Sequence, residues 1–249
     1  MRIGEHKDVR LPVMICQDGF ITSHAVENIL LEEDEAVKKF VGEYKPENYL
    51  LKHDNPLAVG PYDVCPYYME HKMQQVQAMK NAKQVILDVA ADFKATFGRE
   101  YGFFEEYMME DAEIALVLIG STAGTAKACI NELRAAGKKV GLVKVRVFRP
   151  FPGEELAKAI SHCKVVAVMD KVEGFTNEGG PLYNETAAAC INLENRPKMI
   201  NVVYGLGGRD ITTVDIEKIF NHLYEIEETG VIGEHYLHIG QRSNAKEVL

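Results

Sequence analysis

The sequence predicts an α/β fold built on a parallel sheet, and three observations predict it. Residues 114–119 form an unbroken apolar run that is too short for a stable helix, which is typical of a strand buried on both faces. Ala126 and Ile130 then begin a helical pattern of apolar residues, which Gly137 ends. Residues 140–147 return as a second apolar strand. A strand, a helix and a strand in this order form a βαβ unit, whose two strands run parallel.

The same alternation continues toward the C-terminus. Apolar strands are expected at residues 165–169 and 199–204, and helices at 154–160, 182–191 and 212–223. Strands that alternate with helices are typical of a parallel α/β domain, which we place at residues 113–224. Residues 225–249 are expected to form a polar, irregular tail.

The N-terminal part of the chain has a less regular pattern. Residues 11–16 (LPVMIC) are expected to form a short strand that ends in a turn, and residues 32–39 a short helix with an acidic start and a basic end. Residues 42–66 are rich in Pro, Gly, Asn and Asp, which predicts an extended connection or domain boundary. Residues 67–97 carry apolar residues at spacings of three, four and seven and precede Gly98, which predicts one long helix.

Composition limits the classes of partner. The formal net charge of −9 argues against nucleic acid or an anionic membrane surface as the main partner. No apolar run approaches the roughly 20 residues that a membrane span requires. The five cysteines are dispersed without a CxxC pair, which excludes the usual zinc or iron–sulfur spacing and predicts buried thiols in a reducing cytoplasm.

Asp18, Ser23 and His24 are the first candidates for a site, because they follow the predicted strand at residues 11–16. Ligands of parallel α/β sheets collect beyond the carboxyl ends of the strands. The alternative is structural: Asp18 makes an Asx-type turn and Ser23 caps a short helix. This alternative is favoured, because no second catalytic element is visible nearby.

Lys144, Arg146 and Arg149 form a basic group at the end of the second predicted strand. Residues 144 and 146 point the same way on a strand, and two cations on one face require an anion or a carboxylate nearby. One interpretation is an anion or phosphate site. The other, which we favour, is a set of salt bridges to a neighbouring domain or subunit.

Two glycine-rich loops invite a nucleotide interpretation. GSTAGT, residues 120–125, follows a strand and opens a helix, and GLGGRD, residues 205–210, follows a later strand. Neither has the GxGxxG spacing, and no GxxxxGK[ST] motif occurs. Tight turns are therefore the favoured interpretation, and the histidines show no local metal-ligand spacing, so no metal site is expected.

Four motifs occur in order along the chain: PVMICQDGFITSH, KVRVFRPFPGEEL, VMDKVEGFTNEGGPLYNE and YGLGGRDIT. Together they resemble the α subunit of the pyruvate-type 2-oxoacid:ferredoxin oxidoreductases. The resemblance runs from Leu11 to Leu223, and the joint order of the four motifs is far more specific than any one of them.

For the whole enzyme, the resemblance implies oxidative decarboxylation of a 2-oxoacid such as pyruvate to acyl-CoA and carbon dioxide, with coenzyme A and with electrons passed to ferredoxin. The implied cofactors are thiamine diphosphate with Mg²⁺ and 4Fe–4S clusters, none of them bound to this chain alone. The implied partners are a thiamine-diphosphate-binding β subunit, a cluster-bearing δ subunit and a γ subunit, with ferredoxin reached indirectly. A cytoplasmic oligomer is expected.

The resemblance also implies a division of the chain. Residues 1–60 correspond to the C-terminal remnant of the domain that binds the pyrimidine side of thiamine diphosphate, and residues 61–112 to a linker and the long helix. Residues 113–224 correspond to a three-layer domain like the C-terminal domain of transketolase, and residues 225–249 to the tail.

The sequence departs from the family at its start. The family's cofactor-activating glutamate and its substrate-binding threonine and arginine lie in a part of the first domain to which no stretch here corresponds, so a fragment, a split-gene subunit or an expressed piece is expected. No catalytic residue is therefore carried over. Asp18, Ser23 and His24 match the family's DGFxxSH motif and are placed near the domain junction. Lys144 and its two arginine neighbours match KVRxxRPF, an expected inter-domain contact.

Three functions remain open at this point. The first is a structural, inter-subunit portion of a multi-subunit oxidoreductase, inactive in isolation. The second is a stand-alone α/β module that binds a nucleotide or an anion through the Gly120 and Gly205 turns. The third is an adaptor without a ligand.

Overall fold

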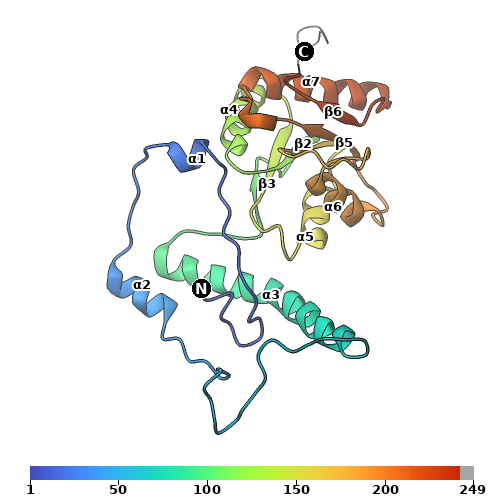
Figure 1. Cartoon of the computed structure of the whole chain (residues 1–249). Coiled ribbons are helices and arrows are strands. Elements are labelled where there is room, and N and C mark those ends of the chain that lie inside the picture. Colours follow the sequence, from blue (N-terminus) through green and yellow to red (C-terminus); the bar gives the residue numbers. More distant parts are fainter. Residues whose placement is uncertain (242–249) are drawn as a thin grey trace. The chain divides into compact units, whose positions relative to one another are not determined.

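A computed structural model describes residues 1–241, and the chain divides into two compact units (Figure 1). The first unit contains residues 1–15 and 27–102, and the second contains residues 16–26 and the chain from residue 103 onward. The short segment 16–26 therefore packs with the second unit, although the chain on either side of it belongs to the first. The domain assignments that the family resemblance implies stay predictions.

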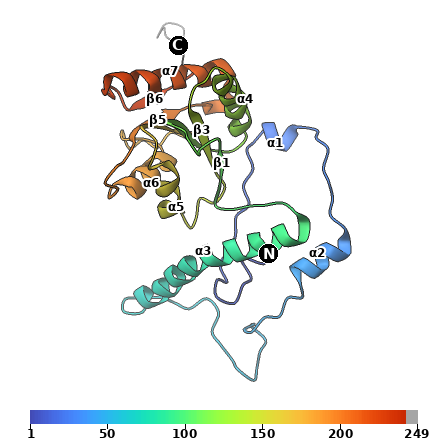
Figure 2. The same cartoon turned by 180° about the vertical axis from the view of Figure 1, so that it is seen from behind.

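The second unit is built on one six-stranded sheet whose strand order is β1-β3-β2-β4-β5-β6. All neighbouring strands run parallel except β1, which pairs antiparallel with β3 at one edge (Figure 2). The strands are β1 (Phe104–Tyr107), β2 (Ile114–Ile119), β3 (Val140–Val145), β4 (Val165–Asp170), β5 (Lys198–Val203) and β6 (Tyr236–His238). The predicted α/β class with a parallel sheet is confirmed.

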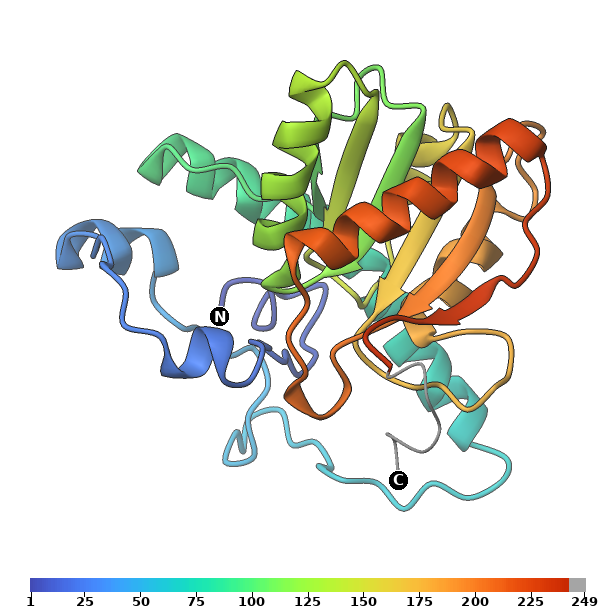
Figure 3. The same cartoon turned by 90° about the horizontal axis from the view of Figure 1, so that it is seen from above.

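Helices cover both faces of this sheet (Figure 3). One core cluster joins the sheet to α4 (Thr122–Ala135) and α7 (Thr213–Thr229), and the other joins it to α5 (Gly153–Ile160) and α6 (Pro181–Cys190). Side chains alternate between the two clusters along each strand, as the strand period of two requires: Leu116 belongs to the first and Val117 to the second. Both are fully buried, which explains why the strand is apolar throughout.

Most predicted elements of this unit have the expected bounds, but the C-terminal prediction is wrong. The last helix does not stop at residue 223; α7 continues to Thr229, where Gly230 closes it in a left-handed conformation. The chain then forms β6, which pairs with β5, and residues 225–241 are therefore not an irregular tail. A three-residue strand carries too little periodicity to be found in the sequence. The rest of the predicted tail, residues 242–249, lies outside the described residues.

The first unit consists of two helices and extended chain. α2 (Asp34–Val41) and the long α3 (Tyr68–Phe97) form as expected, and Gly98 ends α3 in a left-handed conformation. A small core joins Val9 to Ala82 and Val85 of α3. The strand predicted at residues 11–16 is absent: this segment has no regular structure, and it pairs with no neighbouring strand in the described part of the chain.

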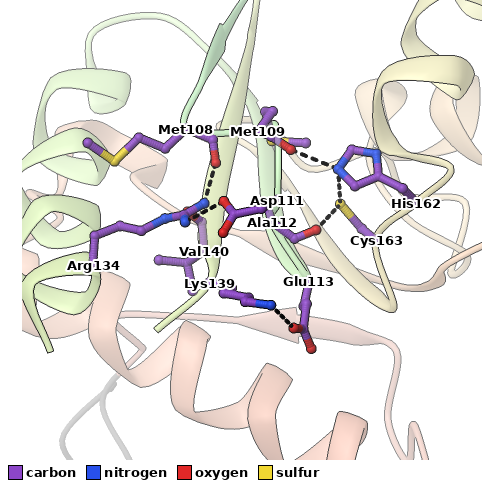
Figure 4. A network of polar contacts seen from close by, with 10 residues as sticks. All are labelled: Met108, Met109, Asp111, Ala112, Glu113, Arg134, Lys139, Val140, His162 and Cys163. Carbon is purple, nitrogen blue, oxygen red and sulfur yellow. Dashed lines mark hydrogen bonds and ion pairs between the residues drawn. The ribbon is translucent and has the colours of Figure 1, made fainter. Parts of the chain in front are cut away.

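A polar network organises the amino ends of the central strands in the second unit (Figure 4). The guanidinium of Arg134, near the end of α4, donates from Nε to the carbonyl of Val140 at 2.7 Å and from Nη1 to Asp111 Oδ1 at 2.6 Å. Its Nη2 donates to the carbonyl of Met108. One side chain thus fastens the turn before β2, the start of β3 and α4 together.

Replacing Arg134 with Ala is expected to lower the free energy of unfolding by about 2 kcal/mol, because charge-assisted bonds to partly buried groups are lost. Urea unfolding followed by circular dichroism measures it. Arg196, an exposed arginine whose guanidinium lies 3.5 Å from the carbonyl of Ile191, is the matched control: its alanine variant is expected to lose less than about 0.5 kcal/mol. Equal losses in both variants would show that the network contributes nothing specific.

Candidate functional site

A crevice with polar side chains in its wall lies at the carboxyl ends of β2 and β4 in the second unit. These strands are neighbours, yet β2 leads into α4 on one face of the sheet and β4 leads toward α6 on the other face. Such a change of direction opens a crevice outside the strand ends, where parallel α/β proteins bind their ligands. The candidate site is therefore in the place where the fold class predicts one.

Asp18 occupies the start of α4 in this crevice. Its Oδ2 accepts from the backbone N–H of Ser121 at 3.2 Å and from the Ser121 hydroxyl, and its Oδ1 accepts from the hydroxyl of Thr22. A carboxylate is favoured at a helix N-terminus, because the N–H groups there are unpaired and the helix dipole is positive. These hydrogen bonds, chiefly that from the Ser121 side chain, lower the pKa of Asp18.

The residues that follow Asp18 hold one another in place. Phe20 has a φ of 73°, which is uncommon for a residue with a side chain, and its N–H donates to Ser23 Oγ at 2.8 Å. Ser23 Oγ is also 2.7 Å from His24 Nδ1, and the His24 ring stacks on Phe20 with ring centroids 5.5 Å apart. We name residues 18–24 the latch, because they fix segment 16–26 to the start of α4.

A pocket of about 160 Å³ lies beside the latch. Its charged lining residues are Lys171, Arg209 and Asp210, and hydroxyls of Thr122 and Tyr204 lie among them. Tyr204 is almost fully buried, and this burial raises the pKa of its hydroxyl. A hydrogen bond with Thr122 lowers the pKa by a smaller amount. With charges of both signs on its wall, the pocket is polar but has no clear preference for anions.

A buried carboxylate supports the loop that borders this crevice. Asp170, at the end of β4, accepts from the backbone N–H groups of Leu182 at 2.9 Å and Tyr183 at 3.1 Å, and from Asn201 Nδ2 at 2.8 Å. Asn201 also accepts from the N–H of Gly180 at 2.8 Å. Burial raises the pKa of Asp170, while these hydrogen bonds lower it. Asp170 thus caps α6 and fixes the end of the preceding loop.

The structure separates the roles of the first three candidates. Asp18 lies at the strand-end crevice. Ser23 and His24 are exposed, and within residues 1–241 their hydrogen bonds and ring contacts are to other residues of the latch. Ser121 is not a capping side chain for α4; its hydroxyl donates to Asp18 instead. The N-terminus of α4, which follows the Gly120 turn, is therefore bound to the carboxylate of Asp18.

The basic group at the end of β3 is partly engaged within its own unit. Arg149 forms an ion pair with Glu185 of α6, and the peptide bond before Pro150 is cis. β3 ends at Val145, so only Lys144 lies on the strand, and Arg146 follows it as an exposed residue. An anion site or an inter-domain contact at Lys144 and Arg146 stays a prediction. The Gly205 loop is a tight turn with a short 3₁₀ helix at Leu206–Gly208.

The sequence patterns miss Asp170 and Asn201 as functional positions. Both lie in strands that are recognisable only by their apolar neighbours, and polar residues in strands buried on both faces are rare unless they are paired. That rarity is the signal that could have found them: Asp170 ends an apolar strand, and Asn201 interrupts another.

Replacing Asp18 with Asn is expected to reduce protection of the Ser121 amide from hydrogen exchange about tenfold, because the charge at the helix start is lost. Asp210→Asn is the matched control, since the Asp210 carboxylate lies in the same pocket but bonds to no group within residues 1–241. Because the pKa of Asp18 is lowered by folding, its stabilisation is present above the ordinary pKa of 3.8 and is lost as the pH falls through the lowered value. Protection of Ser121 that is equal in wild type and both variants would contradict the latch.

Comparison with known proteins defines the class. Residues 1–91 match the family model described as pyruvate flavodoxin/ferredoxin oxidoreductase, thiamine-diphosphate-binding, and residues 112–216 match pyruvate:ferredoxin oxidoreductase core domain II. The two matched segments together define a chain of the 2-oxoacid oxidoreductase class. The chain belongs to the family of pyruvate-type 2-oxoacid:ferredoxin oxidoreductase α subunits, as its four motifs predicted.

Two curated relatives agree with this family. The pyruvate synthase subunit PorA of Thermotoga maritima is 49% identical over 88% of this chain, which covers 56% of that protein. The α subunit of NADH-dependent phenylglyoxylate dehydrogenase from Aromatoleum evansii is 36% identical, with 88% of this chain and 55% of that protein covered. A solved 2-oxoglutarate:ferredoxin oxidoreductase from Magnetococcus marinus superposes on 64% of this chain and 23% of its own, with 18% identity and a TM-score of 0.42. The chain thus spans little more than half the length of the curated relatives it matches.

Proposed function

We propose that this chain is the structural, inter-subunit portion of a cytoplasmic 2-oxoacid:ferredoxin oxidoreductase, with pyruvate as substrate. The whole enzyme would decarboxylate the 2-oxoacid oxidatively, transfer the acyl group to coenzyme A and pass electrons to ferredoxin. The observation that carries the proposal is the 49% identity to a pyruvate synthase subunit over 88% of the chain. No helix within residues 1–241 is long and apolar enough to cross a membrane.

Three observations support placing the family's cofactors on other subunits of the proposed complex. Thiamine diphosphate needs an anion site and carboxylate or amide ligands for its Mg²⁺, but the start of α4 is filled by Asp18. Among the described residues, no group of three His, Cys, Asp or Glu side chains could hold a metal ion. Cys129, Cys163 and Cys190 are buried, which raises their pKa values to about 11, 12 and 11, whereas cluster ligands must be thiolates.

We therefore assign thiamine diphosphate, Mg²⁺ and the 4Fe–4S clusters to the β, γ and δ subunits. When bound in the complex, the thiamine cofactor supplies carbanion stabilisation and the clusters carry single electrons. The part played by this chain is positional: the latch fixes segment 16–26 to the start of α4, and Asp170 fixes the loop at the strand ends.

A stand-alone nucleotide module is not favoured, because the helix start that would bind a phosphate already pairs with Asp18. In this proposal the Asp18 carboxylate does not bind a ligand. It occupies the position at the start of α4 where a phosphate would otherwise bind.

The proposal predicts that the 249-residue chain alone binds no thiamine diphosphate. Isothermal titration with Mg²⁺ present is expected to give no binding heat, whereas the chain purified together with β, γ and δ subunits is expected to bind the cofactor and to reduce ferredoxin with pyruvate. Saturable binding by the isolated chain would overturn the structural role. Failure of the chain to associate with those subunits would overturn its place in the complex.

A further inference from the structure

The loop after β4 and strand β6 form the two walls of an open cleft in the second unit. Its volume is about 510 Å³. We name it the acidic cleft, and its lining residues are Glu173, Phe175, Asn177, Glu234, His235, Tyr236 and His238. We propose that the acidic cleft is a docking surface for a basic segment of a partner subunit, with Phe175 and Glu234 as its main contacts. The proposal rests on the function proposed above.

Phe175 is presented to the solvent by a loop that is held in place. Its side chain is 88% exposed, and its φ of 53° lies in the left-handed region that aromatic residues seldom adopt. Its N–H donates to Glu173 Oε1 at 3.0 Å, and the loop ends at Gly180, which Asn201 holds. A loop whose backbone is already held by hydrogen bonds loses less conformational freedom on association, which lowers the entropic cost of binding through Phe175.

Glu173 fixes this loop to β6. The hydroxyl of Tyr236 donates to Glu173 Oε1, and His238 Nε2 lies 2.7 Å from Oε2. These contacts, with the N–H of Phe175, lower the pKa of Glu173 to about 2, so this carboxylate is ionised throughout the physiological range. Glu173 therefore both joins the two walls of the cleft and contributes a negative charge to it.

The charges and ring faces of the cleft define the ligand. Within the part of the chain that the structure describes, no Lys or Arg lines it, and Glu234 is exposed and bonds to no group there. Glu178 does not line the cleft, but its Oε2 lies 3.8 Å from Nε2 of His235, which does. Carboxylates and the rings of Phe175 and Tyr236 line the same cleft, and together they are groups that recognise a guanidinium or ammonium group.

A partner subunit fits this surface better than a second copy of the chain. The chain has a net charge of −9, so two copies repel one another, and the same charge steers a basic surface toward the cleft. The relatives are themselves described as subunits, which on the proposed function supplies partners of another sequence. The occupant we assign is thus an arginine or lysine side chain on an exposed segment of a different subunit.

The test measures the dissociation constant between the full chain and the co-expressed β, γ and δ subunits by fluorescence anisotropy. Glu234→Lys and Phe175→Ala are each expected to weaken binding about tenfold or more. Two controls remove the same features elsewhere on the unit: Glu228→Lys reverses an exposed charge on α7, and Ile191→Ala removes an exposed apolar side chain after α6. Both controls are expected to stay within about twofold of wild type. Added salt should weaken the wild type more than Glu234→Gln.

The outcomes separate the two proposals. If the wild-type chain binds the other subunits and all four variants bind equally well, the acidic cleft is not the docking surface, while the proposed function stands. If Glu228→Lys weakens binding as much as Glu234→Lys, net charge rather than the cleft is responsible, and the inference is wrong. A wild-type chain that binds only itself would overturn the assigned partner, and one that binds no subunit would overturn the proposed function as well. Thermal melting of each variant confirms that it is folded.

Discussion

Replacing Asp170 with Ala is expected to lower the free energy of unfolding by about 3–5 kcal/mol. The Asp170 carboxylate accepts three hydrogen bonds, from the N–H groups of Leu182 and Tyr183 and from Asn201. Ala would leave all three donors unpaired in a buried site, and each unpaired buried donor costs about 1–3 kcal/mol. Denaturant unfolding of the full chain, followed by near-ultraviolet circular dichroism, measures the loss.

The variant Asp170→Asn tests whether the volume of the side chain or its hydrogen-bond acceptors stabilise the fold. Asp170→Asn keeps the volume, but its amide N–H groups would face the donors at Tyr183 and Asn201, so it is also expected to be destabilised, by about 2 kcal/mol or more. Asp210→Ala, at an exposed aspartate of the same unit, is expected to change stability by less than about 0.5 kcal/mol. An Asp170→Ala variant as stable as wild type would mean that water replaces the carboxylate, and the account of the α6 cap would be wrong.

The centre of the sheet is predictable from the sequence for a physical reason. Strands buried on both faces must be apolar throughout, so the apolar run coincides with the bounds of β2 at Ile114–Ile119. Helix ends are predictable where a glycine adopts a left-handed conformation, as Gly98 and Gly137 do. In these elements local preference and tertiary burial agree.

The edges of the sheet could not be predicted in this way. β1 (FEEY) is antiparallel and exposes its glutamates, and β6 has only three residues, so neither carries the apolar pattern of a buried strand. The opposite error arises at residues 11–16, where an apolar run predicts a strand but no partner strand is present in the described part of the chain. Strand pairing is a tertiary property, and a short apolar run does not specify it.

Only part of the candidate site could be placed from the sequence. Asp18 follows an apolar run and so becomes a candidate, but its partner Ser121 lies 103 residues away, and no local pattern connects them. Asp170 and Asn201 contact one another across β4 and β5, which are neighbours in the sheet but are separated in the sequence by α6. No local sequence pattern connects these two residues either. Long-range polar pairs depend on strand order, which a single sequence does not define.

Replacing Gly180 with Ala is expected to destabilise the chain by about 3 kcal/mol, because there is no space for a methyl group. A Cβ at this position would lie 2.3 Å from Cγ and 2.6 Å from Cβ of Asp170. The backbone itself is permissive, with a φ of −75°, so the effect is steric and not conformational. The glycine before Pro181 is therefore required by the close approach of the Asp170 side chain, and not by the turn.

Gly124→Ala is the matched control for Gly180→Ala, since Gly124 lies within α4 and a Cβ there meets no atom within 4 Å. That variant is expected to be more stable than wild type by about 0.5–1 kcal/mol, because Ala favours the helix. In the double variant Asp170→Ala/Gly180→Ala the clash with Cγ is gone, so its loss should be smaller than the sum of the two single losses. Strict additivity would show that the glycine and the carboxylate act independently, and would contradict their close packing as the reason for the GGP sequence.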